Sequence, residues 1–497
     1  MQSNDQNLED EDYLNIGSAI TDSGITISVK GKTYAIEYPQ EVWKRYPNAK
    51  KKILLENIPF MQTCHLPASH KKKGAIYNTA LPMFEPFAFK STMLDIPSTA
   101  VIDHEKTVDY MKEFFNVEFR FSSYDSSVPI HNNKKQLSRS RQKTAVILFT
   151  AGKESLLNLA LCIELGIRPI LVYMDEAPGA PESAHKYKII ETIENEYGIK
   201  THKIRNEPGK LRYCDLGEEA NNWGAGTQFL TYVLIVQPFV DRFNADYILF
   251  GNEYSCDDYT FDKEGFKSNF CFDQCSGWTK QLNVVANMMA GNGVTVGSLA
   301  GPLYELALIQ ILHGRYPKLA KLQMSCFSDT PEGKDNVWCG HCSKCARMFV
   351  FFKALGIDTA ELGFKNNMFN KPSMGLFSMF GTKDLYSYDV SGLGVEEQAL
   401  AFYLSEGRGE KGYLIDEFRK LSLFKRTQQK IVELKDKYFS RYESIMIPKE
   451  LEHRVMAIFK ETLGSDFSPQ DFRLKQVIEE EQKQSDVAAS EGLPQPA

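Results

Sequence analysis

The sequence predicts an α/β fold built on a parallel sheet, and three observations support this. Between residues 144 and 250, short and continuously apolar strands alternate with helical stretches, a pattern typical of a parallel sheet that helices cover on both faces. The 497 residues are 43% hydrophobic and 25% charged, as in ordinary globular proteins. A chain of this length is too long for one core, so we expect two or three domains.

The N-terminal part predicts a separate α+β domain over residues 13–125. Residues 25–29 and 32–37 are rich in β-formers and flank Lys30-Gly31, which predicts a hairpin. The polar segment 1–12 predicts disorder. Residues 126–142 are polar and basic; a solvated linker is favoured there over a nucleic-acid contact.

The central part, residues 143–365, carries the alternating pattern. We expect strands at 144–149, 169–174, 200–204 and 246–250, and helices at 153–165, 182–197 and 226–243. Gly166 and Gly198 follow two of these helices and are typical C-terminal caps. Ligands of parallel sheets bind at the carboxyl ends of the strands. The turn after residue 149, Asp175-Glu176 and Gly251-Asn252-Glu253 are therefore expected at one rim.

The C-terminal part divides at about residue 366. Residues 366–478 are expected to be mainly helical, and the acidic, polar tail 479–497 to be disordered.

The turn Thr150-Ala151-Gly152-Lys153-Glu154-Ser155 follows the first central strand and opens a helix. Backbone N–H groups at a helix start bind phosphate, and Lys153 and Ser155 add a charge and a hydroxyl donor. A Walker A loop is excluded, because Ile147 replaces its first glycine and Glu154 its Ser/Thr. Gly407, Gly409 and Gly412 match a dinucleotide fingerprint formally, but no apolar strand precedes them.

Four cysteines predict a metal site. Cys339, Cys342 and Cys345 are regularly spaced, and Cys326 lies 13 residues upstream. Four thiolates suit tetrahedral Zn²⁺ in a closed, structural site; an iron–sulfur cluster and a coincidental grouping are the alternatives. The remaining cysteines are interpreted as inert thiols of a reducing compartment: Cys64, Cys162, Cys214, Cys256, Cys271 and Cys275.

The turn resembles the pyrophosphate loop of the PP-loop ATP pyrophosphatases, Ser-Gly-Gly-x-Asp-Ser, with Thr150, Ala151, Gly152, Glu154 and Ser155 at the motif positions. The resemblance implies an adenine nucleotide alpha hydrolase-like core that binds ATP and Mg²⁺ and cleaves ATP to AMP and pyrophosphate. Ala151 departs from the motif at a cost of about 1–2 kcal/mol if the turn requires a positive φ. Glu154 reaches one methylene further than aspartate.

The cysteines extend the resemblance to 7-cyano-7-deazaguanine synthases, which have a similar zinc site and an arginine at the position of Arg347. The ATP-dependent UDP-N-acetylmuramoyl-L-alanyl-L-glutamate epimerase is also similar in its N-terminal extra domain. The likeness covers about residues 144–364. It implies catalytic roles for Lys153, Ser155 and Arg347. The implied nucleotide contacts are Thr150, Ala151, Gly152, Lys153, Glu154, Ser155, Tyr173, Asp175, Gly251, Asn252 and Glu253.

The resemblance therefore implies a cytoplasmic enzyme that adenylates a small-molecule carboxylate, followed by amide or nitrile formation (a ligase) or epimerisation (an isomerase). Candidates for the later step are Glu253, Glu305, His313, Arg315 and Arg347. The alternatives are an RNA-base-modifying PP-loop enzyme and a nucleotide-binding module without turnover. The net charge of −6 and pI of about 6.0 argue against nucleic acid, and no apolar stretch predicts a membrane span. A homodimer is left open.

Overall fold

The computed structural model describes residues 11–129, 142–217, 221–291, 293–328, 330–380 and 394–464. The disorder predicted for 1–12 and 479–497 lies outside these residues, except for Glu11 and Asp12. Most of the predicted linker also lies outside them.

The described strands form one ten-stranded, mostly parallel sheet, and a separate hairpin pairs β10 (Thr260–Phe261) with β11 (Lys267–Ser268). Across the large sheet the order is β12 (Thr295–Gly297), β9 (Tyr247–Leu249), β6 (Thr144–Leu148), β7 (Arg168–Asp175), β8 (Thr201–Asn206), β3 (Lys32–Glu37), β2 (Gly24–Val29), β1 (Tyr13–Ile20), β4 (Gly74–Ala80) and β5 (Glu118–Ser123). The run from β12 to β8 is parallel, which confirms the α/β prediction.

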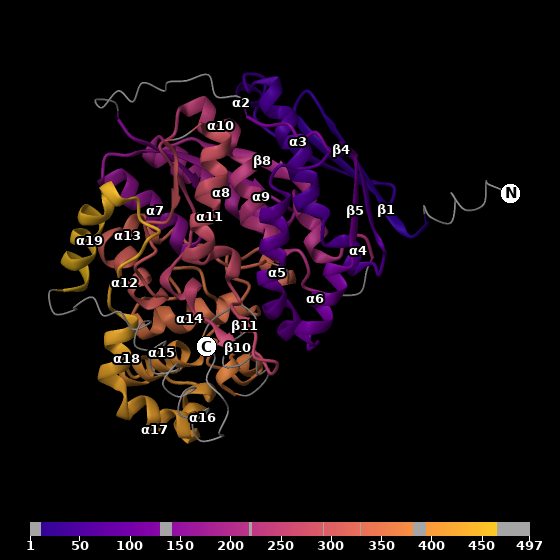
Figure 1. Cartoon of the computed structure of the whole chain (residues 1–497). Helices are drawn as coiled ribbons and strands as arrows, with labels where there is room; N and C mark the ends of the chain where they lie inside the picture. The colour runs from indigo at the N-terminus through magenta and orange to yellow at the C-terminus, as the bar shows by residue number, and fades with distance from the viewer. Residues whose placement is uncertain are drawn as a thin grey trace, which may run out of the picture.

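Helices surround the sheet (Figure 1). Those before β6 are α2 (Gln40–Trp43), α3 (Asn48–Thr63), α4 (Leu66–Ser69), α5 (Glu85–Ile102) and α6 (Thr107–Phe115). The central ones are α7 (Lys153–Glu164), α8 (Pro181–Tyr197), α9 (Gln228–Ile235), α10 (Gln237–Phe243), α11 (Ser276–Ala290), α12 (Glu305–Arg315), α13 (Pro317–Ala320) and α14 (Ser343–Leu355). The C-terminal ones are α15 (Val395–Gly407), α16 (Tyr413–Lys420), α17 (Ser422–Gln429), α18 (Ile431–Tyr438) and α19 (Lys449–Leu463).

The central strands are apolar throughout because both of their faces are buried. In β6, Ala145 and Ile147 face a core formed with α7, α8, α12 and α14. Val146 and Leu148 face a second core formed with α3, α9, α10 and α11. The alternation of side chains along a strand produces these two sides. The helix predicted over 226–243 is divided into α9 and α10; Pro238, at the start of α10, lacks the N–H that a continuous helix would use.

The N-terminal strands continue the central sheet. The predicted hairpin is confirmed, with Lys30 and Gly31 at φ 49° and 75° in its turn. Its second strand, β3, pairs with β8 through Ile36–Asn206 and Glu37–Arg205. The division into regions 13–125 and 143–365 stays a prediction, but the two regions share one sheet.

The C-terminal helices, drawn orange to yellow in Figure 1, pack on the central part. The Glu397 carboxylate of α15 accepts a hydrogen bond of 3.1 Å from the Leu306 N–H at the start of α12. The described part of 366–478 contains the helices α15 to α19. Within the described ranges, every helix is too short or too polar to cross a bilayer.

Candidate nucleotide and metal sites

The turn after β6 leads through a left-handed residue into the uncapped start of a helix. Ala151 adopts φ 57°, in the left-handed region, and Gly152 then precedes the first residue of α7 without any side-chain cap. The Thr150 hydroxyl accepts a hydrogen bond of 3.3 Å from the Gly152 N–H, and the Ser155 hydroxyl donates one of 3.1 Å to the Gly152 carbonyl. The first-turn N–H groups of an α-helix have no partner within the helix. The start of α7 could therefore hold an anion.

A cavity of about 460 Å³ opens at this turn, at the carboxyl ends of β6 and β7. Thr150, Glu154 and Ser155 line one part of it, and Tyr173 and Gly251 another. Gly251 packs closely there: a Cβ at this position would lie 2.9 Å from the Glu154 Cβ. Five of the predicted nucleotide contacts thus share one cavity.

Glu176 faces the cavity, whereas Asp175 is turned inward. Asp175 is 2% exposed and accepts hydrogen bonds from Ser183 (2.8 Å) and Tyr187, so it joins the end of β7 to α8. Glu176 is held by Arg212, whose guanidinium lies 2.6 and 2.7 Å from the two carboxylate oxygens. The sequence analysis did not identify Arg212, since no local motif contains it.

In the segment Gly251-Asn252-Glu253, Gly251 lines the cavity, whereas the next two side chains point away from it into the protein. The Asn252 amide donates to the Thr279 hydroxyl at 3.1 Å, and Glu253 is buried next to Lys153. Both side chains are buried, and neither lines the cavity. Their predicted contact with nucleotide stays a prediction.

Lys153 lies in a buried group of charges behind the turn. Its ammonium is 3.0 Å from Glu305 and 3.7 Å from Glu253, and it also pairs with Glu154. Burial alone would lower the pKa of Lys153, but the three carboxylates outweigh it and raise the pKa well above the ordinary value. Lys153 is therefore a permanent cation, and it does not line the cavity.

Arg347 completes this group. Its guanidinium lies 3.1 Å from Glu305, so Glu305 is placed between two cations. Burial raises the pKa of the Glu305 carboxyl, but the charges of Arg347 and Lys153 lower it by more than burial raises it. The net effect is a lowered pKa. Burial and the charge of Glu305 raise the pKa of the neighbouring Glu397 to about 8. The predicted residues Lys153, Glu253, Glu305 and Arg347 are thus brought together.

The four predicted cysteines form a buried cluster, with all four Sγ atoms within 4.8 Å of one another. The Sγ distances are 4.0 Å for Cys326–Cys342 and 3.8 Å for Cys339–Cys345. A tetrahedral Zn²⁺ with Zn–S bonds of about 2.3 Å requires S···S separations of about 3.8 Å. Backbone N–H groups also point at the sulfurs, as from Ser328 to Cys326 at 3.2 Å. The donor set fits a single metal ion.

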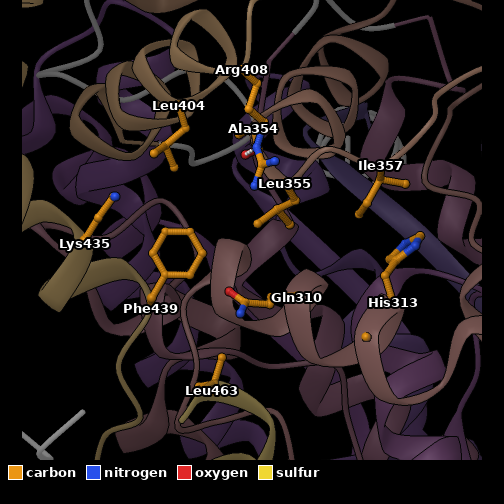
Figure 2. Close-up of a pocket in the computed structure, with 11 residues that line it drawn as sticks. Gln310, His313, Ala354, Leu355, Ile357, Leu404, Arg408, Lys435, Phe439 and Leu463 are labelled. Carbon is orange, nitrogen blue, oxygen red and sulfur yellow. Dashed lines mark hydrogen bonds between the residues drawn. The ribbon is translucent and has the colours of Figure 1, made fainter. Parts of the chain in front are cut away.

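His313 and Arg315 lie elsewhere. His313 borders a second cavity of about 490 Å³ between α12, α14, α15, α18 and α19, together with Gln310, Arg408, Lys435 and Phe439 (Figure 2). Arg315 pairs with Glu164 at 2.6 Å on a partly exposed surface. Neither residue lines the cavity at the turn.

The sequence analysis also missed a thiol pair. Cys256 and Cys271 were interpreted as inert, but their side chains share a hydrogen bond, which is the main cause of a lowered pKa at Cys271; Arg347 lowers it further. Gln274, which lines the cavity, lies 4.0 Å from the Cys256 sulfur. The residues are 15 positions apart in loops, so no spacing rule could have joined them.

In comparisons with known proteins, no family model matches the chain, and no curated protein matches it with significant sequence similarity.

Proposed function

We propose that this chain is a PP-loop ATP pyrophosphatase that adenylates a small-molecule carboxylate. One observation supports this above the others: the Thr150–Ser155 turn holds Ala151 at φ 57°, leads into the uncapped start of α7, and borders a cavity of about 460 Å³. Helix starts of this kind bind phosphate. Cavities of 300–1,000 Å³ are typical of small-molecule sites.

The cavity has suitable walls for both ends of ATP. At the turn, the N–H groups of α7 and the Ser155 hydroxyl would hold the phosphates, and Glu154 would hold Mg²⁺, which prefers carboxylate ligands. At the other end, Val172, Tyr173 and Met174 offer apolar and aromatic surface to the base. The cysteine site would hold Zn²⁺ as a structural ion, since four thiolates leave no open position.

Lys153, Glu305 and Arg347 would serve the acceptor side. Transfer of AMP makes a carboxylate electrophilic and gives it a good leaving group. The buried cations behind the turn do not line the cavity and would act through Glu154, the lining carboxylate that pairs with Lys153. Amide or nitrile formation and epimerisation both begin with this step.

The test is release of pyrophosphate and AMP from ATP and Mg²⁺ by the metal-loaded full chain, with pools of candidate carboxylates. A carboxylate labelled with ¹⁸O should transfer one labelled oxygen to AMP. Glu154→Gln should lower turnover at least 100-fold, whereas Glu196→Gln, an exposed change on α8, should not alter it. ATP binding without pyrophosphate release would favour a binding module without turnover.

The thiol pair favours a second candidate, a PP-loop enzyme that thiolates an RNA base. Such chemistry needs a reactive cysteine near the nucleotide. The hydrogen bond from Cys256 lowers the pKa of Cys271 and raises that of Cys256, and Gln274, a lining residue of the cavity, lies beside Cys256. The net charge of −6 argues against a broad RNA surface. Pyrophosphate release that depends on added tRNA, and not on carboxylates, would select this candidate.

A further inference from the structure

The cysteine segment supplies one wall of the cavity at the Thr150–Ser155 turn. Phe327 and Lys344 line the cavity together with Thr150, Glu154 and Ser155. Phe327 directly follows Cys326, and Lys344 directly precedes Cys345. The metal ligands thus fix the backbone on either side of this wall.

The two side chains support each other. The Lys344 ammonium lies 4.1 Å from the centre of the Phe327 ring, within the range of a cation–π contact. Phe327 is 41% exposed, so its ring is accessible from the cavity that it lines. This contact holds the Lys344 ammonium at the cavity without using its charge in an ion pair.

Lys344 differs in this respect from the other cations of the region. Lys186 also lines the cavity but pairs with Glu182. Lys153 does not line the cavity, and it pairs with the carboxylates of Glu154, Glu253 and Glu305. For Lys344, no carboxylate oxygen of the described residues lies within 4 Å of the ammonium. Its charge is therefore available to an anionic ligand in the cavity.

The cysteine segment is also joined to the turn itself. The Met324 N–H, two residues before Cys326, donates a hydrogen bond of 2.8 Å to the Ala151 carbonyl. The His185 ring of α8 also lies 2.8 Å from the carbonyl oxygen of Gly333, which belongs to the same segment between Cys326 and Cys345. These contacts place Lys344 and the phosphate-binding turn in one fixed arrangement.

We propose that Lys344 binds the polyphosphate of the nucleotide, together with the start of α7. This inference rests on the proposed function. An ammonium is a compact phosphate partner, and the loss of one charge-assisted contact is expected to weaken binding about tenfold or more. The affinity for AMP, which lacks the pyrophosphate group, should change little when the Lys344 charge is removed.

The test is calorimetric binding of ATP and of AMP to the zinc-loaded full chain with Mg²⁺. Lys344→Ala should weaken ATP binding at least tenfold and AMP binding less than twofold. Lys344→Arg, which keeps the charge, should bind ATP within about threefold of the unmodified chain. Lys334→Ala is the matched control, because it removes an exposed lysine of the same segment outside the cavity. Zinc content and melting temperature establish that each variant is folded.

The outcomes separate the two proposals. If the unmodified chain binds ATP and Lys344→Ala binds it equally well, the role of Lys344 is wrong and the proposed function stands. Equal weakening of ATP and AMP would also overturn the assignment to the polyphosphate. If the unmodified chain binds no ATP at millimolar concentration, both proposals fail. If Lys344→Ala loses zinc, the Lys344→Arg variant is the decisive one. A Lys344→Arg variant that retains zinc but loses ATP affinity would refute the role of the Lys344 charge.

Discussion

Ala151 is the residue whose backbone most directly shapes the turn. The left-handed region that it occupies costs an L-residue with a Cβ about 1–2 kcal/mol, and the hydrogen bond from Met324 to its carbonyl helps to hold it there. Glycine, which the resembling family has at this position, would avoid the cost. Position 151 is in the left-handed region although alanine, and not glycine, occupies it.

A larger side chain at position 151 should therefore be costly. We expect Ala151→Val to lower the free energy of unfolding by about 2 kcal/mol, because a branched side chain is strained at positive φ and the site is fully buried. Ala151→Gly should change it by less than about 1 kcal/mol. Urea unfolding of both variants checks this. Equal free energies of unfolding for Ala151→Val and Ala151→Gly would contradict backbone strain at position 151.

Lys153 compensates buried carboxylates, so its removal should also be costly. Lys153→Met keeps the aliphatic length and removes the charge beside Glu305 and Glu253. Loss of one partner of a buried ionic group costs about 3–5 kcal/mol. Lys50→Met breaks the more exposed pair with Asp241 and should cost less than about 1 kcal/mol. Denaturant unfolding compares the two, and similar small losses would refute the role of Lys153.

At the scale of elements, Glu397 joins α15 to the start of α12, and its pKa gives a pH dependence. The folded pKa is about 8, against an ordinary value of 4.5, chiefly because the carboxyl is buried. The protonated form is thus favoured in the folded state. The contribution of this carboxyl to stability is fully present below about pH 4.5 and is lost as the pH rises through 8.

The substitution Glu397→Gln should remove the loss of stability that ionisation of Glu397 causes at high pH. Glutamine can keep the hydrogen bond from Leu306 and does not ionise. The free energy of unfolding of the unmodified chain, relative to Glu397→Gln, should fall on the order of 4 kcal/mol between pH 5 and pH 8.5. Urea unfolding at both pH values measures the difference, in which the other titrating groups largely cancel. A constant difference would contradict a raised pKa.

The elements that were predicted correctly have strong local signals. The apolar strand 144–149 corresponds to β6, and the helix 182–197 to α8 with its left-handed Gly198. The cysteine cluster was predicted because Cys339, Cys342 and Cys345 have the regular spacing of metal ligands. By contrast, β3 and β8 join through two residue pairs, and the wall formed by Phe327 and Lys344 depends on how distant segments pack. Neither feature has a periodicity or spacing that a sequence could reveal.

At the scale of the whole molecule, the four-cysteine cluster joins α14 to the segment around Cys326, whose Met324 hydrogen-bonds to the turn after β6. We expect metal analysis to return about one zinc per chain. Cys342→Ser/Cys345→Ser should lose the metal and lower the melting temperature, because structural zinc contributes folding free energy. Cys214→Ser, outside the cluster, is the control and should retain zinc. Stoichiometric iron with visible absorbance would instead support an iron–sulfur cluster.

Because the two regions share one continuous sheet, we expect them to unfold cooperatively. Trp43 of α2 and Trp278 of α11 come from the two regions that the sequence separates, yet both lie in one core with Val146 and Ile170. Opening either region would expose apolar surface of the other, so the two should unfold together. Variants that retain only Trp43 or only Trp278 should give coincident fluorescence transitions in urea. Two separate midpoints would instead show that residues 13–125 unfold as an independent domain, and that the β3–β8 pairing adds little cooperativity.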